Sequence, residues 1–111
     1  SEDDLLVTNL HNEIIEATSA NVFFMIDGQL QTPDVSQSGV NGIMRQVILS
    51  QYPNTLVKSL TLNEIADAQA MFICNCVMGV MPIRRFNNRA LAIEQVTVIR
   101  DSLKPTESLY D

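Results

Sequence analysis

The sequence predicts an α/β (α+β) fold in which a mixed, largely antiparallel and barrel-like sheet is accompanied by about three helices. Several short runs are rich in β-branched and aromatic residues, which is typical of strands. Other segments place apolar residues three and four positions apart, which is typical of amphipathic helices. The chain has 111 residues, of which 46% are hydrophobic, so we expect one domain with a real core.

Strands and a tight turn are predicted for the first third of the chain. Residues 4–10 and 20–26 are rich in β-branched, aromatic and other apolar residues, and both are predicted to be strands. Asp27-Gly28 is a type I′ turn signal, because both central residues of that turn must accept a positive φ angle. Residues 29–32 are then the returning strand of a β-hairpin.

The middle of the chain predicts two helices separated by a weak strand. Apolar residues at helical spacing predict an amphipathic helix over residues 43–51. A weak alternation over residues 55–60 predicts a strand. Thr61 and Glu64 have the spacing of a capping box, so a short helix is expected over residues 62–68.

The last third predicts a buried strand, its neighbour and a final helix. Residues 70–76 form a nearly continuous apolar run, as expected of a central strand that is buried on both faces. A turn over residues 77–79 leads to a neighbouring strand over residues 80–86. Asn87-Asn88 predicts another turn, and the apolar spacing within residues 93–103 predicts the last helix.

The chain contains two cysteines and one histidine, the residue types that most often bind transition metals. Cys74 and Cys76 stand two residues apart on one face of the predicted strand, near the ~7 Å Cα limit for a disulfide, which disfavours a bridge. We expect both to be small buried residues in a reducing cytoplasm. Because the only histidine, His11, is distant in sequence, no metal site is predicted.

Composition excludes several classes of partner. The chain has 13 acidic and 7 basic residues and a formal net charge of −6, which argues against nucleic acid as a partner. No apolar run approaches the ~20 residues of a membrane span, and residues 1–4 lack the basic and apolar parts of a signal peptide. We therefore expect neither membrane nor nucleic acid as a partner, and a cytoplasmic location.

No complete catalytic constellation occurs in the sequence. A nucleophile elbow, a metalloprotease helix motif and a P-loop are all missing, and the only lysines are Lys58 and Lys104. The chain alone is expected to supply ligand binding without a complete catalytic site.

One glycine-containing segment suggests anion binding. In residues 39–45 (GVNGIMR) glycines precede the predicted helix start, where the N–H groups of Ile43 and Met44 would have no partner within the helix. Gly42 would let an anion approach the backbone closely. The alternative stays open, because most helices that follow a glycine bind no phosphate.

Two polar residues have both a structural and a functional interpretation. Asn75 lies in the apolar run, where an unsatisfied amide would cost about 1–3 kcal/mol. It is either a satisfied structural amide or a donor to a bound oxyanion. Glu16 alternates with apolar neighbours, so the residues alone favour a solvated glutamate.

Four segments in one order resemble a known family. They are residues 16–23 (EATSANVF), Thr32-Pro33, residues 39–45 (GVNGIMR) and residues 73–82 (ICNCVMGVMP). The set is similar to the large C-terminal domain of fold-type IV pyridoxal-phosphate enzymes, which have the D-amino-acid aminotransferase-like fold. The segments look more like the 4-amino-4-deoxychorismate lyases than the branched-chain or D-amino-acid aminotransferases.

The resemblance implies roles for residues that bind the cofactor, pyridoxal 5′-phosphate. Glu16 matches the carboxylate that bonds the pyridine nitrogen, where it would keep the ring protonated and make it a better electron sink. The N–H groups of Ile43 and Met44 match the phosphate cradle. Asn75 matches a side-chain contact to the phosphate.

Other matched positions surround that site. Asn21 matches a structural asparagine at the strand end, and Gly42 and Arg45 belong to the same glycine-containing motif. The turn from Cys76 to Gly79, which carries Val77 and Met78, would lie beside the substrate cleft.

The sequence departs from the family in one important respect. In the family the Schiff-base lysine precedes the glutamate by a few dozen residues, whereas only 15 residues precede Glu16 here and none is lysine. Residues 1–111 are therefore expected to be a C-terminal cofactor-binding domain without its N-terminal domain, with no catalytic residue of its own and inactive alone.

The resemblance also implies what the parent enzyme does. We expect a homodimeric lyase that converts the small molecule 4-amino-4-deoxychorismate to 4-aminobenzoate and pyruvate in folate biosynthesis. One alternative is a domain of a fold-type IV aminotransferase for branched-chain or D-amino acids. The other is a non-catalytic interaction module that keeps the fold.

Overall fold

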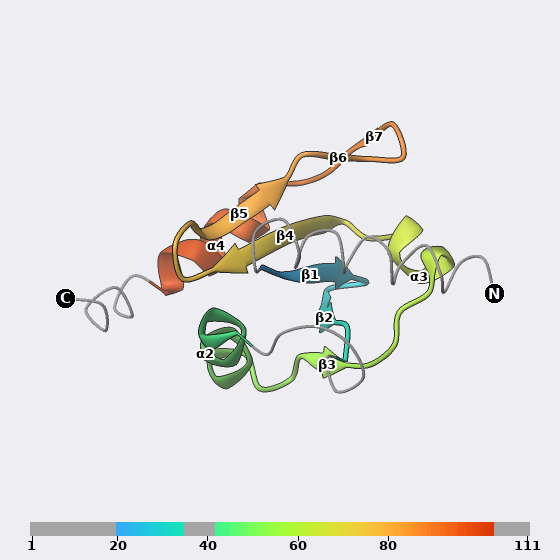
Figure 1. Cartoon of the computed structure of the whole chain (residues 1–111). Coiled ribbons are helices and arrows are strands. Elements are labelled where there is room, and N and C mark those ends of the chain that lie inside the picture. Colours follow the sequence, from blue (N-terminus) through green and yellow to red (C-terminus); the bar gives the residue numbers. More distant parts are fainter. Residues whose placement is uncertain (1–19, 35–41, 104–111) are drawn as a thin grey trace.

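The computed structural model describes residues 20–34 and 42–103, and these ranges contain three helices, a five-stranded sheet and a two-stranded sheet. Figure 1 shows the larger sheet at the centre, with the helices packed around it. The predicted α/β class with about three helices is confirmed. The strand predicted over residues 4–10 lies outside the described residues.

A β-hairpin forms the middle of the sheet. Strand β1 (Asn21–Ile26) pairs antiparallel with β2 (Gln29–Thr32). Asp27 and Gly28 both have positive φ angles, 52° and 74°, so the predicted type I′ turn is confirmed. The side chain of Gln69 supports this turn, because its Oε1 accepts a hydrogen bond from the Gly28 N–H at 3.0 Å.

Three further strands complete the larger sheet. Strand β4 (Ala70–Asn75) pairs antiparallel with β1, and β5 (Gly79–Ile83) pairs antiparallel with β4. Strand β3 (Leu56–Val57) pairs parallel with β2. The strand order is β3-β2-β1-β4-β5, so the sheet is mixed and largely antiparallel, as predicted (Figure 1).

The predicted barrel-like closure is wrong for the described residues. The five-stranded sheet is open, with β3 and β5 at its two edges. Strand β3 has only two residues, both exposed, which is too short and too peripheral to continue the sheet toward β5. The predicted strand over residues 55–60 is correspondingly shortened.

The strand predicted over residues 80–86 divides into two. Strand β5 ends at Ile83, and β6 (Arg85–Phe86) pairs with β7 (Arg89–Ala90) in a separate hairpin. Asn87 and Asn88 form its turn with φ angles of 52° and 61°, which confirms the turn prediction. Asparagine tolerates this left-handed backbone better than most residues.

The three helices lie close to their predicted positions. Helix α2 (Ile43–Gln51) has the predicted bounds, whereas α3 (Leu62–Ala66) ends two residues early and α4 (Glu94–Ser102) one residue early. The capping box is confirmed: the Glu64 N–H donates to Thr61 Oγ1 at 3.2 Å, and the Thr61 N–H donates to Glu64 Oε1 at 3.2 Å.

Buried side chains form one cluster on each face of the sheet. On one face Phe23 and Phe72 stack at 5.1 Å between ring centroids and pack with residues of α2 and α4. The opposite face carries Val22, Phe24 and Met71, which pack with α3. The first cluster holds α2 against the sheet, so that the start of α2, the start of β1 and the end of β4 converge.

Candidate functional site

A cavity of about 230 Å³ lies where these three chain segments meet. Its lining residues are Asn21, Gly42, Ile43, Met44, Asn75, Cys76 and Val77. The structure thus brings together most of the residues that the sequence predicts at the cofactor site. Glu16 lies outside the described residues, and Arg45 and Met78 are next to the lining without being part of it.

The N-terminus of α2 supplies backbone donors to this cavity. Gly42 is the N-cap residue and has an extended backbone, and no side chain caps the helix. The first bond within the helix runs from the Gln46 N–H to the Gly42 carbonyl at 3.1 Å, so the earlier amides have no acceptor inside the helix. The N–H groups of Ile43 and Met44, together with the helix dipole, make this end suited to an anion.

Asn21 fixes the position of the helix start. Its side chain is buried, and its Oδ1 accepts a hydrogen bond from the Gly42 N–H at 3.3 Å. A Cβ atom on Gly42 would lie only 2.9 Å from the same Oδ1 atom. A larger residue at position 42 would therefore force the buried Asn21 side chain to shift, so glycine favours this close approach between α2 and β1.

Asn75 closes the opposite side of the cavity. Its Oδ1 accepts hydrogen bonds from the N–H groups of Val77 and Met78, at 3.0 and 2.6 Å, and so shapes the turn between β4 and β5. Only the amide nitrogen of this side chain has protons to offer an anion. The structural and the functional interpretation of Asn75 are therefore compatible, because they use different atoms.

Arg45 lies one position beyond the cavity lining and is buried. Its Nη2 donates to the Pro33 carbonyl at 3.3 Å, which ties α2 to the segment that follows β2. Burial lowers the pKa of the guanidinium from its ordinary value, and the charge of Asp34 acts in the opposite direction. Arginine still keeps its proton in proteins, so the buried side chain of Arg45, a residue of the first turn of α2, carries a positive charge.

The two cysteines differ, and one prediction about them is wrong. Both are free thiols and Cys74 is buried, where desolvation raises its pKa to about 12. Cys76 was predicted to be buried but is exposed, because β4 ends at Asn75 and Cys76 belongs to the turn. The turn from Cys76 to Gly79 is predicted to lie beside the substrate cleft, and Cys76 and Val77 of this turn line the cavity.

Apolar side chains surround the mouth of the cavity. Val77 is 92% exposed and Ile43 57% exposed, and both line the cavity. Met78 is 41% exposed in the same turn. Exposed apolar side chains around a cavity are typical of a surface that meets a ligand or another part of a protein.

The described part of the chain supplies no amine or metal at this cavity. Lys58 is not in the lining and forms an ion pair with Glu64 at 2.6 Å, and Lys104 lies outside the described residues. Residues 20–34 and 42–103 contain no group of histidine, cysteine and acidic residues that could hold a metal ion. Nor does any helix in these ranges have the length and apolarity to span a membrane.

Known proteins resemble this chain in sequence and in fold. The sequence model of the amino-transferase class IV family matches residues 1–86. The aminodeoxychorismate lyase of Vibrio harveyi is 36% identical over 84 residues, which are 72% of this chain and 31% of that protein. A probable branched-chain-amino-acid aminotransferase of Thermotoga maritima is 28% identical over 101 residues, which are 83% of this chain and 35% of that protein.

Solved structures show the same fold. The 4-amino-4-deoxychorismate lyase from Pseudomonas aeruginosa has a TM-score of 0.71 and 26% identity, over 78% of this chain and 34% of that one. An aminotransferase from Brucella abortus, bound to the cofactor PLP, has a TM-score of 0.67 and 26% identity, over 79% of this chain and 33% of that one. The chain thus spans about a third of the length of the proteins it matches.

Proposed function

Because the chain belongs to the aminotransferase class IV family, a family of pyridoxal-phosphate enzymes, we propose that its cavity at the start of α2 holds the phosphate of pyridoxal 5′-phosphate. The observation that carries this proposal is the uncapped helix start, which Asn21 holds close to β1 through a contact that leaves little room for a side chain at residue 42. A phosphate ester fits such a site, since it accepts hydrogen bonds and complements the helix dipole.

The residues of the cavity would bind the phosphate from different elements. The Ile43 and Met44 N–H groups would donate to phosphate oxygens from one side, and the Asn75 amide nitrogen from the other. Arg45 would not touch the phosphate, but its buried charge would favour an anion in the first turn of α2. When bound, the cofactor supplies an electron sink for the carbanion formed on a substrate.

Glu16 is proposed to hold the pyridine nitrogen of the cofactor in its protonated form. The support is the family motif around residues 16–23, because Glu16 lies outside the described residues. A carboxylate beside that nitrogen would stabilise the ring cation and so strengthen the electron sink.

For the parent protein we propose a lyase that converts 4-amino-4-deoxychorismate to 4-aminobenzoate and pyruvate, a step toward folate, as a cytoplasmic homodimer. The lyase of Vibrio harveyi at 36% identity and the lyase structure at a TM-score of 0.71 support this choice. On this proposal residues 1–111 are the C-terminal cofactor-binding domain, and the Schiff-base lysine comes from the longer protein. The exposed turn at Val77 and Met78 would face the substrate.

An aminotransferase is the second candidate, because probable branched-chain-amino-acid aminotransferases match over 80% or more of this chain. The two reactions are distinguished by product in the longer protein that contains this chain. With 4-amino-4-deoxychorismate as substrate, release of pyruvate supports the lyase. Transfer of the amino group to a keto acid without pyruvate supports the aminotransferase.

The binding proposal is tested on the 111-residue chain with cofactor analogues that lack the reactive aldehyde. Pyridoxine 5′-phosphate and pyridoxine differ only in the phosphate, and neither modifies lysine. We expect the phosphate ester to bind roughly tenfold or more tightly, as for a ligand that gains charge-assisted hydrogen bonds. Equal affinities, or no binding of either, would favour the non-catalytic interaction module.

A further inference from the structure

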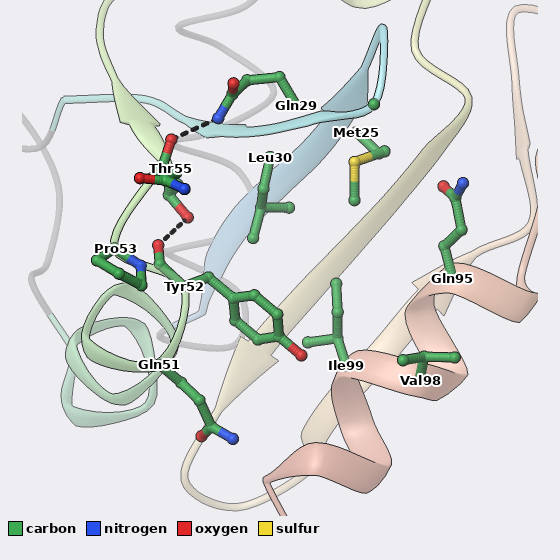
Figure 2. Close-up of a pocket in the computed structure, with 12 residues that line it drawn as sticks. Met25, Gln29, Leu30, Gln51, Tyr52, Pro53, Thr55, Gln95, Val98 and Ile99 are labelled. Carbon is green, nitrogen blue, oxygen red and sulfur yellow. Dashed lines mark hydrogen bonds between the residues drawn. The ribbon is translucent and has the colours of Figure 1, made fainter.

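A second and larger cavity opens at the other end of α2. It has a volume of about 650 Å³, shares no residue with the first cavity, and is lined by parts of the β1–β2 hairpin, the segment that follows α2, and α4. Figure 2 shows Leu30 and Met25 extending into it from the hairpin, and Val98 and Ile99 facing it from α4. Its volume falls in the range of small-molecule sites.

Hydrogen bonds between separate elements hold the walls of this cavity in place. The Gln51 amide nitrogen donates to the Ser102 carbonyl at 2.8 Å, and the hydroxyls of Tyr52 and Ser102 are bonded at 2.8 Å. These bonds join the end of α2 to the end of α4. On the other side the Gln29 amide nitrogen donates to the Asn54 carbonyl, which joins the hairpin to the segment after α2 (Figure 2). A cavity with fixed walls binds a ligand at a smaller cost in conformational entropy.

The inner surface of the cavity is apolar and includes one aromatic ring. Leu30 and Ile99 are buried there, and the half-buried ring of Tyr52 lies between them (Figure 2). Val98, which is 65% exposed, extends the apolar surface toward the entrance. Such a surface favours a flat hydrocarbon or aromatic body, because rings stack or pack edge-on against tyrosine.

The polar groups of the cavity are all uncharged. The lining residues include four with carboxamide side chains (Gln29, Gln51, Asn54 and Gln95) and two with hydroxyls (Tyr52 and Thr55). The amide nitrogens of Gln29 and Gln51 already donate within the protein. None of the twelve lining residues carries a charge, although the chain contains 13 acidic and 7 basic residues. A charged ligand would lose hydration there without gaining a counter-charge, whereas a neutral amide-like group can form hydrogen bonds with uncharged carboxamides.

We propose that this cavity is a second ligand site, which binds a neutral, flat molecule with an amide-like edge. The ring would pack against Tyr52, Leu30 and Ile99, and the edge would bond to the carboxamides at the entrance. The site is independent of the proposed cofactor site, because it shares none of its residues and requires a ligand of different charge.

The test uses three probes with the same ring and different charge: benzamide, benzoate and benzamidine. Each is titrated into the ¹⁵N-labelled 111-residue chain, and amide chemical shifts are followed. We expect benzamide to bind with a dissociation constant on the order of a millimolar and to shift residues around Tyr52 and Ile99. Benzoate and benzamidine should bind there roughly tenfold more weakly. Equal binding of all three, or benzamide shifts outside the cavity, would overturn the proposal.

A pair of matched variants tests the role of charge directly. Val98→Asp places a carboxylate at the entrance, and Ala90→Asp places one on the exposed β7 strand, outside the lining. Val98→Asp should weaken benzamide and strengthen benzamidine, each by roughly threefold or more. Ala90→Asp should change neither. If both variants have the same effect, or Val98→Asp has none, the assigned site is wrong.

Discussion

The two ends of α2 face two cavities that select ligands in different ways. At the N-terminal end the donors are backbone N–H groups, which the helix itself leaves without partners. At the C-terminal end the polar groups are carboxamide side chains contributed by the hairpin, the helix end and α4. A single short helix can therefore present an anion site through its backbone and a neutral site through side chains at its other end.

The two ends also differ in how they tolerate substitution. The N-terminal site depends on a close approach of the Gly42 backbone to the Asn21 side chain, where a single methyl group at Gly42 would meet Asn21 Oδ1 at 2.9 Å. The C-terminal site depends on glutamine and asparagine side chains that are exposed or, for Gln29, half-buried, and these can be exchanged one at a time. We therefore expect sharp losses at the first site and graded losses at the second.

The largest effect is expected from a variant that disrupts the buried cluster shared by the two ends of α2. Phe72 stacks on Phe23 in the cluster that holds α2 and α4 to the sheet. Phe72→Ala should destabilise the chain by about 3–5 kcal/mol, as for other buried aromatic truncations, and should weaken both cavities together. Denaturant unfolding and the two ligand titrations measure this. Loss of one site with the other intact would show that the cluster does not support both.

The next effect is confined to the N-terminal end. Gly42→Ala should lower the affinity for pyridoxine 5′-phosphate by roughly tenfold or more and destabilise the chain by about 1–3 kcal/mol, because the new methyl group overpacks against Asn21. Benzamide binding at the C-terminal end should change little.

A second-site variant supplies the control for this prediction. Asn21→Ala removes the oxygen that the new methyl group meets, so the double variant should be less destabilised than the sum of the two single variants. Additive stabilities would mean that the contact between Gly42 and Asn21 is not the cause.

A smaller effect concerns the charge that the first cavity accepts. Asn75→Asp keeps an oxygen for the Val77 and Met78 N–H groups but replaces the amide nitrogen with a second oxygen. The turn should persist, whereas the affinity for pyridoxine 5′-phosphate should fall by roughly threefold to tenfold through repulsion. Unchanged affinity would remove Asn75 from the set of phosphate contacts.

The cysteines give no expected effect on stability at neutral pH, and they separate core from cavity. Burial raises the pKa of Cys74 to about 12 from an ordinary value of 9.0, so the folded chain holds this proton more tightly than the unfolded chain. The free energy of unfolding should be insensitive to this group below pH 9 and should decrease between pH 9 and 12. Cys74→Ala should reduce that decrease, which unfolding measured across this pH range would show.

Exposure should govern alkylation of the two thiols. At pH 8 iodoacetamide should modify exposed Cys76 and leave buried Cys74 largely unmodified. Because Cys76 lines the first cavity, pyridoxine 5′-phosphate should slow its alkylation. Equal rates with and without this ligand would place the ligand elsewhere.

Local chemistry explains which parts of the fold could be predicted. The Asp27-Gly28 turn, the Thr61–Glu64 capping box and the turn at Asn87-Asn88 depend on neighbouring residues, and each is present. Barrel-like closure, the full strand over residues 55–60 and the burial of Cys76 depend on where strands end and pair, and these predictions failed.

The candidate site could be predicted only in part. Helical spacing and a preceding glycine indicated an anion site at Ile43, but only the family resemblance joined it to Asn21 and Asn75. The structure shows that β1, α2 and β4 bring these three residues to one cavity. The second cavity had no signal in the sequence, because its residues come from three separate elements and form no motif.

The most direct test of the comparison is a titration of the ¹⁵N-labelled chain with inorganic phosphate, followed through amide chemical shifts. We expect saturable changes in chemical shift at the Ile43 and Met44 N–H groups and the Asn75 side-chain amide. The shifts of residues around Tyr52 and Asn54 should stay unchanged. Shifts of equal size at both ends of α2, or none at Ile43 and Met44, would contradict this expectation.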